Sequence, residues 1–310
     1  MRRTALLLTS LLLCCAVVAK RIPPKRPRIL GIAGATILVS NVADARNFYL
    51  KLIDPNHVCN YCEQAPARFL FLPNGQRITL EKAPDPLPAN LLGEVSLLTE
   101  DLEGFKRYFH ANKIEFGEVR QKRGGELIRI VLQDPEGHHI SITDSYHLAN
   151  ADDLSAGLPP SHARNSVRII HAGFIVNDRA AADHFYQDVL GFHLYWHGGM
   201  KDDETSWVAM QVPDGTDWVE YMLNISPTAD KRTRGVMNHI SLGVPDIHAI
   251  QAQIVKAGVK LTEQPQIGRN GKWQLNLYDA DATRVEFMEF TPVQKPCCSE
   301  FAGAHPGPHP

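Results

Sequence analysis

The sequence predicts an α+β fold made of four similar units, each with the element order βαβββ. Two observations predict it. β-Favouring residues alternate with others on a period of two in short runs, and the first run of each unit is followed by apolar residues at helical spacing. This pattern then recurs along the chain, which is typical of a duplicated architecture.

The first two units are expected between residues 30 and 144. In the first unit we expect a strand, a helix and two further strands, at 32–39, 41–52, 68–72 and 77–81. Asp44 lies near the start of the helix, where an acidic side chain is favourable. In the second unit the opening strand, the helix and the closing strand are expected at 94–98, 102–112 and 139–142.

The other two units are expected between residues 168 and 291. The third unit runs from Ile169 to Leu223 with a helix at 178–190. The fourth runs from Met237 to Phe290, with an opening strand at 237–241 and a helix at 246–257.

Constant offsets relate the two halves of the chain. Phe48-Tyr49 lies 137 residues before Phe185-Tyr186, and Asp134 lies 145 residues before Asp279. We therefore expect the second half to be a duplicate of the first. Residues 145–167, which contain Asn150-Ala151-Asp152-Asp153 and a Gly-Leu-Pro-Pro run, are predicted to be the linker.

The N-terminus is typical of an export signal. Arg2 and Arg3 precede an apolar run at 5–18, and Val17-Val18-Ala19 resembles a signal-peptidase site. The run is short for a membrane span, so we expect residues 1–19 to be removed and the mature protein to be periplasmic or secreted.

The remaining cysteines bear on the C-terminal tail. Removal of residues 1–19 leaves Cys59, Cys62, Cys297 and Cys298, an even number in an oxidising compartment. Bridges from Cys59 or Cys62 to Cys297 and Cys298 would tether the tail, but the sequence leaves the pairing open. Residues 292–310 are rich in Pro, Gly and His, and we expect a flexible tail.

Composition narrows the class of partner. The formal net charge is -2 and the body of the chain has no long basic block, so no nucleic-acid partner is expected. We expect a small-molecule substrate and, after removal of the signal peptide, no contact with a membrane. A monomer and a homodimer both stay open.

Four side chains in the second half predict a metal site. His171, Glu220, His239 and Glu286 each lie within a predicted strand, where an ionisable group is costly to bury without a partner. Two imidazoles and two carboxylates suit one divalent metal ion, and Zn, Ni, Co, Mn and Fe are not distinguished by these ligands.

Residues two positions away along a strand share its face, which predicts the walls of a pocket around the metal. The expected pocket residues are Trp218, Met222, Met237, Arg284 and Met288. Apolar walls with one cation suit a small organic substrate that carries a carboxylate or another oxyanion. We expect His193, Trp196 and His197 to be loop packing, with a role at the mouth of the site as the alternative. We expect Arg269, Asn270 and Trp273 in a surface hairpin, with a lid as the alternative.

Two stretches resemble the vicinal oxygen chelate superfamily, which includes glyoxalase I, bleomycin-resistance proteins and extradiol ring-cleaving dioxygenases. They are 185–192 (FYQDVLGF) and 278–290 (YDADATRVEFMEF), and the resemblance extends over residues 30–291. It implies that the four units pair into two glyoxalase-like half-barrel domains, at 30–144 and 168–291. It also implies that the metal ligands come from the first and last strands of each unit.

The first half lacks the ligand set. The offsets align Gly34 with His171, Glu94 with His239 and Ser141 with Glu286. A glycine and a serine cannot replace an imidazole and a carboxylate, so residues 30–144 are expected to be a degenerate domain without metal.

The ligand set resembles that of glyoxalase I, which implies a metal-dependent lyase or isomerase that acts through an enediolate-type intermediate. Glu220 and Glu286 would then be catalytic and carry the proton. An extradiol dioxygenase that uses Fe(II) is an alternative, because four units with metal only in the later half favour it. A non-catalytic small-molecule binding protein of the same fold is the other alternative.

Overall fold

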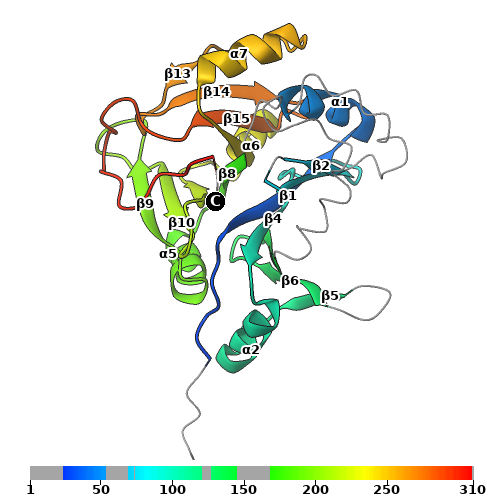
Figure 1. Ribbon diagram of the computed structural model, residues 1–310, viewed down its shortest axis with the longest axis vertical. Coiled ribbons are helices and arrows are strands. Elements are labelled where there is room, and N and C mark those ends of the chain that lie inside the picture. Colours follow the sequence, from blue (N-terminus) through cyan, green and yellow to red (C-terminus); the bar gives the residue numbers. More distant parts are fainter. Residues whose placement is uncertain (1–23, 54–68, 73, 121–126, 145–167, 309–310) are drawn as a thin grey trace, which may run out of the picture.

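The computed structural model describes residues 24–53, 69–72, 74–120, 127–144 and 168–308, which form two mixed β-sheets with helices packed on them (Figure 1). The predicted signal peptide and linker, together with Cys59 and Cys62, lie outside these residues. Among the described helices, none combines the length and the apolar composition that a membrane span requires.

The first sheet belongs to the first half of the chain. Its strands and helices, in chain order, are β1 (Gly31–Val39), α1 (Val42–Ile53), β2 (Phe69–Phe71), β3 (Arg77–Lys82), β4 (Leu92–Thr99), α2 (Leu102–Asn112), β5 (Gly117–Arg120), β6 (Leu127–Gln133) and β7 (His139–Asp144). The helix at 102–112 has the predicted bounds, and Asp101 caps it by accepting a hydrogen bond from the Gly104 amide.

The second sheet belongs to the second half. Its elements are β8 (Arg168–Ile175), α5 (Arg179–Asp183), η2 (His184–Val189), β9 (His193–Gly198), β10 (Trp207–Gln211), β11 (Trp218–Met222), α6 (Lys231–Met237), β12 (His239–Val244), α7 (Ile247–Lys256), β13 (Gln266–Ile267), β14 (Trp273–Tyr278) and β15 (Arg284–Glu289). The element η2 is a π-helical turn that continues α5.

The two sheets share the same pairing order at their centres, although the described residues give seven strands in the first sheet and eight in the second. The strand orders are β2-β3-β1-β4-β7-β6-β5 and β13-β14-β15-β12-β8-β11-β10-β9. At the centre of each sheet the opening strands of its two units pair antiparallel, β1 with β4 and β8 with β12. Each opening strand also pairs parallel with the last strand of its own unit. This arrangement confirms the predicted α+β fold.

Reciprocal contacts join the two halves. Tyr49 of α1 donates a hydrogen bond to Asp279 at 3.2 Å, and Tyr186 of η2 donates one to Asp134 at 3.0 Å. The two tyrosines are related by the 137-residue offset and the two aspartates by the 145-residue offset. The duplication seen in the sequence is therefore also a symmetry of the docked structure.

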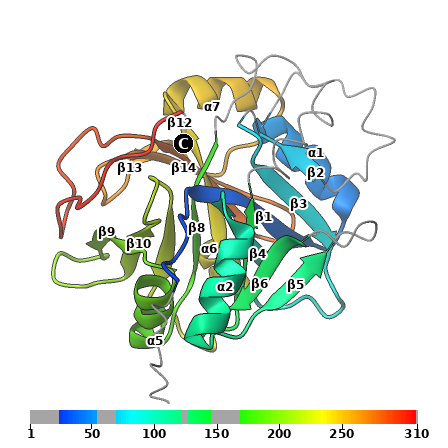
Figure 2. The same ribbon diagram turned by 60° about the horizontal axis from the view of Figure 1, so that its bottom comes forward.

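A second reciprocal pair lies where β1 and β8, which belong to different sheets, come close to each other (Figure 2). The Ile32 amide donates to Asp217 at 2.9 Å, and the Ile169 amide donates to the Gln76 side chain at 2.6 Å. The Gln76 amide group also donates to the carbonyls of Ile32 and Ile169, at 2.7 and 2.9 Å. One buried glutamine therefore satisfies three backbone groups at the junction.

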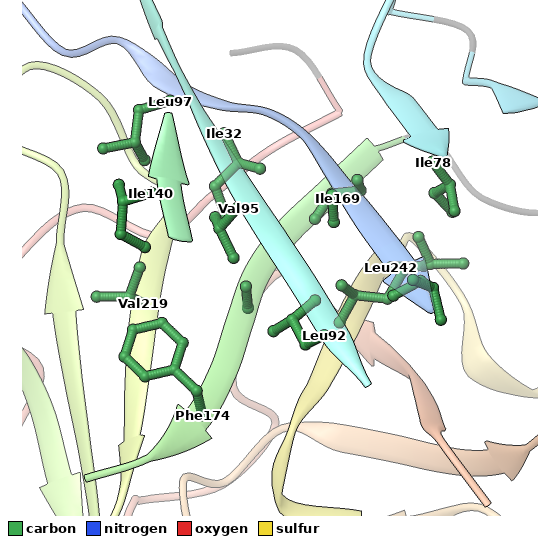
Figure 3. Packing of buried hydrophobic residues seen from close by; sticks show 14 of the residues in the cluster. Ile32, Ile78, Leu92, Val95, Leu97, Ile140, Ile169, Phe174, Val219 and Leu242 are labelled. Atoms are coloured by element: carbon green, nitrogen blue, oxygen red, sulfur yellow. The ribbon is translucent and has the colours of Figure 1, made fainter. Parts of the chain in front are cut away.

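The halves share one hydrophobic core, which lies between the sheets. Figure 3 shows Val95 and Leu97 of β4 in the same cluster as Ile169 of β8 and Val219 of β11. A separate and smaller cluster contains Tyr195, Trp196, Trp218 and neighbouring residues of the second half, and it lies outside this shared core.

Three features differ from the sequence predictions. The strand expected from Met237 begins at His239, because Asp230 caps helix α6 and this helix continues to Met237. The tail is not flexible as expected: residues 292–308 pack against the second half through hydrogen bonds such as Ala302 N–H to the Tyr195 carbonyl. Cys297 and Cys298 form a disulfide with each other rather than with Cys59 or Cys62.

We predict that Gln76→Ala lowers the free energy of unfolding by about 3 kcal/mol, because it leaves three buried backbone groups without partners. Gln133→Ala is the matched control, since the Gln133 side chain is exposed and its change should stay within about 0.5 kcal/mol. Urea unfolding of both variants measures this, and equal midpoints for Gln76→Ala and wild type would contradict it.

Candidate metal centre

Four neighbouring strands bring the candidate ligands together. His171 lies in β8 opposite Ser241 of β12, and Ser241 in turn lies opposite Glu286 of β15. β11, which carries Glu220, pairs with β8 on its other side. All four ionisable side chains are almost completely buried, with exposed fractions between 0 and 9%.

Three of the four meet as one group. The Nε2 atoms of His171 and His239 are 3.1 Å apart, and Glu220 Oε2 lies 3.9 and 3.6 Å from them. All three ligand atoms lie within 4.8 Å of one another, as in a divalent metal site. Glu286 lies outside this group, although its Oε2 is 3.3 Å from His171 Nε2.

Burial sets the charge of the group. Desolvation, followed by the positive charge of Arg284, holds the pKa of both His171 and His239 well below the usual value. Both rings are therefore neutral at pH 7, which is the form that binds metals. Burial, followed by repulsion from Glu286, raises the pKa of Glu220 to about 8, and burial also raises that of Glu286.

Local contacts orient the two imidazoles. His239 Nδ1 lies 3.1 Å from the carbonyl of Met237, so its N–H donates there and the Nε2 lone pair faces the group. His171 stacks on Trp218, with ring centroids 4.7 Å apart. Opposite His239 lies Gly173, where any Cβ would collide with the imidazole ring. The absence of a side chain at Gly173 thus leaves room for the His239 ring.

These residues fit a divalent cation. Ligands that bind one metal at about 2.1 Å are roughly 3 to 3.5 Å apart, which is close to the spacings seen here. Glu286 Oε2 and His171 Nδ1 are buried without a hydrogen-bond partner. A cation at this place would neutralise the carboxylates of Glu220 and Glu286. The Arg284 guanidinium lies 2.6 Å from His239 Nε2, so it would have to move aside for the metal.

A cavity of about 810 Å³ opens onto the group. Glu220 and Glu286 reach it, and four of the five predicted pocket residues line it: Met222, Met237, Arg284 and Met288. Trp218 is not among the lining residues. The rings of Tyr195 and Trp218 pack with their centroids 5.2 Å apart, and Lys272 Nζ lies 5.0 Å from the centroid of the Trp218 ring. These two residues therefore cover Trp218 and separate it from the cavity.

Part of the cavity wall was not predicted from the sequence. Trp196 and Arg269, expected in a packed loop and a surface hairpin, both line the cavity, as does Trp207 of β10. Residues 294–297 of the C-terminal segment also line it. The alternation of apolar residues in β9 and β10 could have indicated the tryptophans, whereas the return of the C-terminus has no local signal.

The first half carries no comparable group in its described residues. Glu94 forms an ion pair with Arg129 at 2.8 Å and accepts hydrogen bonds from Ser96 and Ser141. Its carboxylate is therefore satisfied by side chains at the place where the second half has its candidate ligands.

The fold and the site together define a protein of duplicated βαβββ units with a His-Glu-His group consistent with a divalent metal. Residues 168–287 match the model of the Glyoxalase/Bleomycin resistance protein/Dioxygenase superfamily, so this region of the chain is similar to that superfamily.

Known proteins resemble the chain in two ways. The lactoylglutathione lyase of Haemophilus influenzae is 27% identical over 125 residues, which are 40% of this chain and 93% of the lyase. A variant of homoprotocatechuate 2,3-dioxygenase from Brevibacterium fuscum superposes with a TM-score of 0.59 at 17% identity, over 91% of this chain and 75% of the dioxygenase. The homoprotocatechuate 2,3-dioxygenase of Arthrobacter globiformis superposes with a TM-score of 0.57 at 15% identity, over 85% of this chain and 80% of the dioxygenase. The dioxygenases thus share the fold of both halves.

We predict that His239→Ala and Glu220→Ala each reduce bound metal to below about a tenth of the wild-type stoichiometry, because each removes a ligand from a three-residue group. Glu289→Gln is the control: Glu289 lies on the same strand as Glu286, but it accepts a hydrogen bond from the Ile247 amide at the start of α7. Metal analysis of the dialysed proteins measures this, and an unchanged metal content in both variants would contradict it.

The raised pKa of Glu220 predicts a pH dependence for the metal-free protein. Its folded pKa of about 8 exceeds the usual glutamate pKa of 4.5, so the stability that its neutral form provides is lost as pH rises between these values. The difference in unfolding free energy between wild type and Glu220→Gln should fall by up to about 1.4 kcal/mol per pH unit. Urea unfolding at pH 5, 6.5 and 8 measures it, and parallel curves for the two proteins would refute it.

Proposed function

We propose that this protein is a metal-dependent enzyme that acts on a small organic substrate with two neighbouring oxygen atoms. The observation that carries the proposal is the His171–Glu220–His239 group beside a cavity of about 810 Å³. Two imidazoles and one carboxylate leave several positions of a divalent metal open to a substrate. When bound, such a metal polarises the oxygens that it contacts.

Extradiol ring cleavage, with Fe(II) as the metal, is the reaction that we favour. The group of two histidines and one carboxylate is the ligand type typical of non-haem Fe(II) oxygenases. The shared fold of homoprotocatechuate 2,3-dioxygenase over both halves supports the same reaction class. The rings of Trp196 and Trp207, which line the cavity, suit a planar aromatic substrate.

A glyoxalase-like lyase or isomerase is the second candidate, and Glu286 favours it. Its Oε2 has no hydrogen-bond partner and lies 3.3 Å from His171, and the residue lines the cavity. A carboxylate at that place can take a proton from the carbon next to a bound oxygen and return it to the neighbouring carbon. The sequence similarity to lactoylglutathione lyase, 27% identity over 125 residues, supports this candidate.

Arg284 supports an anionic substrate in either reaction. Its guanidinium contacts His239, and no carboxylate of the described residues lies within 4 Å of it in an ion pair. A guanidinium can bind a carboxylate through two parallel hydrogen bonds. We therefore infer that the substrate carries a carboxylate, which pairs with Arg284 beside the chelated oxygens.

The two reactions are separated by loading the protein anaerobically with Fe(II) and then adding oxygen and catechols that carry a carboxylate side chain. A new absorbance from ring-opened product supports the dioxygenase. Turnover of 2-oxoaldehyde–thiol adducts by the Ni- or Zn-loaded protein supports the lyase or isomerase. Tight binding of a ligand without turnover in either assay would instead identify a non-catalytic binding protein.

We predict that Arg284→Met weakens the binding of a carboxylate-bearing catechol by about 30-fold, because a charge-assisted bidentate contact contributes roughly 2 kcal/mol. Metal content should not fall, since Arg284 competes with the metal for His239. Arg179→Met, at an exposed site on α5, is the control. Calorimetric titration of the metal-loaded proteins measures this. Equal affinities, or loss of the metal from Arg284→Met, would contradict it.

A further inference from the structure

The C-terminal segment, residues 292–305, connects the two edges of the second sheet. Those edges are β13 and β9. Near the start of the segment, the amides of Val293 and Cys297 donate to the carbonyls of Gly271 and Arg269, at 2.8 and 2.9 Å, in the turn between β13 and β14. Farther along, the Ala302 amide donates to the Tyr195 carbonyl of β9 at 2.9 Å. Figure 1 shows the segment in red on the side of β9 and β10.

Aromatic contacts fix the far end of the segment. The ring of Phe301 packs on Tyr195 with centroids 4.8 Å apart, and the Tyr195 hydroxyl lies 2.6 Å from His305 Nδ1. The buried Lys272 ammonium donates to the same hydroxyl at 3.2 Å and lies 5.4 Å from the Phe301 ring. This end is therefore anchored in the small cluster that covers Trp218.

The middle of the segment is part of the cavity wall. Residues 294–297 line the cavity together with Trp196 and Arg269. The backbone of Cys297 holds both of these neighbours: its amide bonds to the Arg269 carbonyl, and its carbonyl accepts a hydrogen bond from Trp196 Nε1 at 3.2 Å. A ligand that fills the cavity therefore touches the segment or the residues that it holds.

The Cys297–Cys298 disulfide lies between the two anchored ends. The φ of Cys298 is 72°, in the left-handed region that residues with side chains rarely adopt. A covalent link between adjacent side chains restricts the backbone of both residues, and it reduces the freedom to leave this conformation.

We propose that the C-terminal segment is a ligand-contacting wall of the cavity, and that the Cys297–Cys298 disulfide keeps it in place and so determines how tightly the cavity holds its ligand. The inference rests on the proposed function in taking the cavity as the substrate site. A dithiol reductant breaks the S–S bond by transferring two electrons, each cysteine sulfur gains a proton, and the reductant becomes a cyclic disulfide. The freed backbone of Cys297 then holds Arg269 and Trp196 less firmly.

Hydrogen exchange tests the position of the wall without using a ligand. Full-length protein is compared oxidised, after dithiothreitol, and as Cys297→Ser/Cys298→Ser, with Cys59→Ser/Cys62→Ser as the control for the other cysteines. We expect peptides within 292–305 to exchange at least about tenfold faster in reduced wild type and in the Cys297→Ser/Cys298→Ser variant. The control variant should behave as wild type with and without reductant. Equal protection in the oxidised and reduced proteins overturns the proposal.

Binding of 4-nitrocatechol to the metal-loaded proteins tests the effect on the cavity. We expect about tenfold weaker binding to Cys297→Ser/Cys298→Ser, because a mobile wall must be ordered when the ligand binds. The metal content should equal that of wild type. Wild-type affinity in this variant overturns the proposal. If the probe binds neither protein, the proposed catechol-cleaving function fails, and hydrogen exchange alone then decides whether the disulfide fixes the segment.

Discussion

The second half of the protein depends on the burial of four ionisable side chains beside one another. Two imidazoles and two carboxylates occupy strands that are hydrogen-bonded in the sheet, so their separation is set by the backbone register. Two carboxylates in one buried place repel each other, and neutralisation by a proton or a cation relieves this. Burial first, and repulsion from Glu286 second, raise the pKa of Glu220, and the guanidinium of Arg284 lies beside His239. A divalent metal bound at this place would also relieve the repulsion, and it would give the two neutral imidazoles a role.

The duplicated first half shows that the fold does not require this charge. The first half takes part in the reciprocal contacts Tyr49–Asp279 and Tyr186–Asp134 that join the two halves, and it shares one hydrophobic core with the second half. At Gly34, which aligns with His171, an added Cβ would collide with the backbone carbonyl of Arg77 in the paired strand. An imidazole at that place would require β3 to move. The first half therefore supports the second without reproducing its chemistry.

The sequence predicted the fold well because each unit has a clear period and because constant offsets relate the units. The presence of one ionisable side chain in each of four predicted strands indicated His171, Glu220, His239 and Glu286, which lie near one another in the structure. The prediction was weaker at positions whose surroundings are set by contacts between residues far apart in the sequence. Trp218 shares a strand face with Glu220, yet residues of β9 and Lys272 cover it. Similarly, the composition of residues 292–305 indicates flexibility, whereas contacts with β9 and with the β13–β14 turn hold the segment.

The central claim is that His171, His239 and Glu220 share one cation. Crystals of the metal-loaded protein, measured at the absorption edge of the bound metal, test it most directly. The account predicts one strong anomalous peak at bonding distance from both Nε2 atoms and from a carboxylate oxygen of Glu220, with Arg284 turned away from His239. A peak at another place, such as beside Asp202 and the C-terminal cysteines, with none between the two histidines, would contradict it.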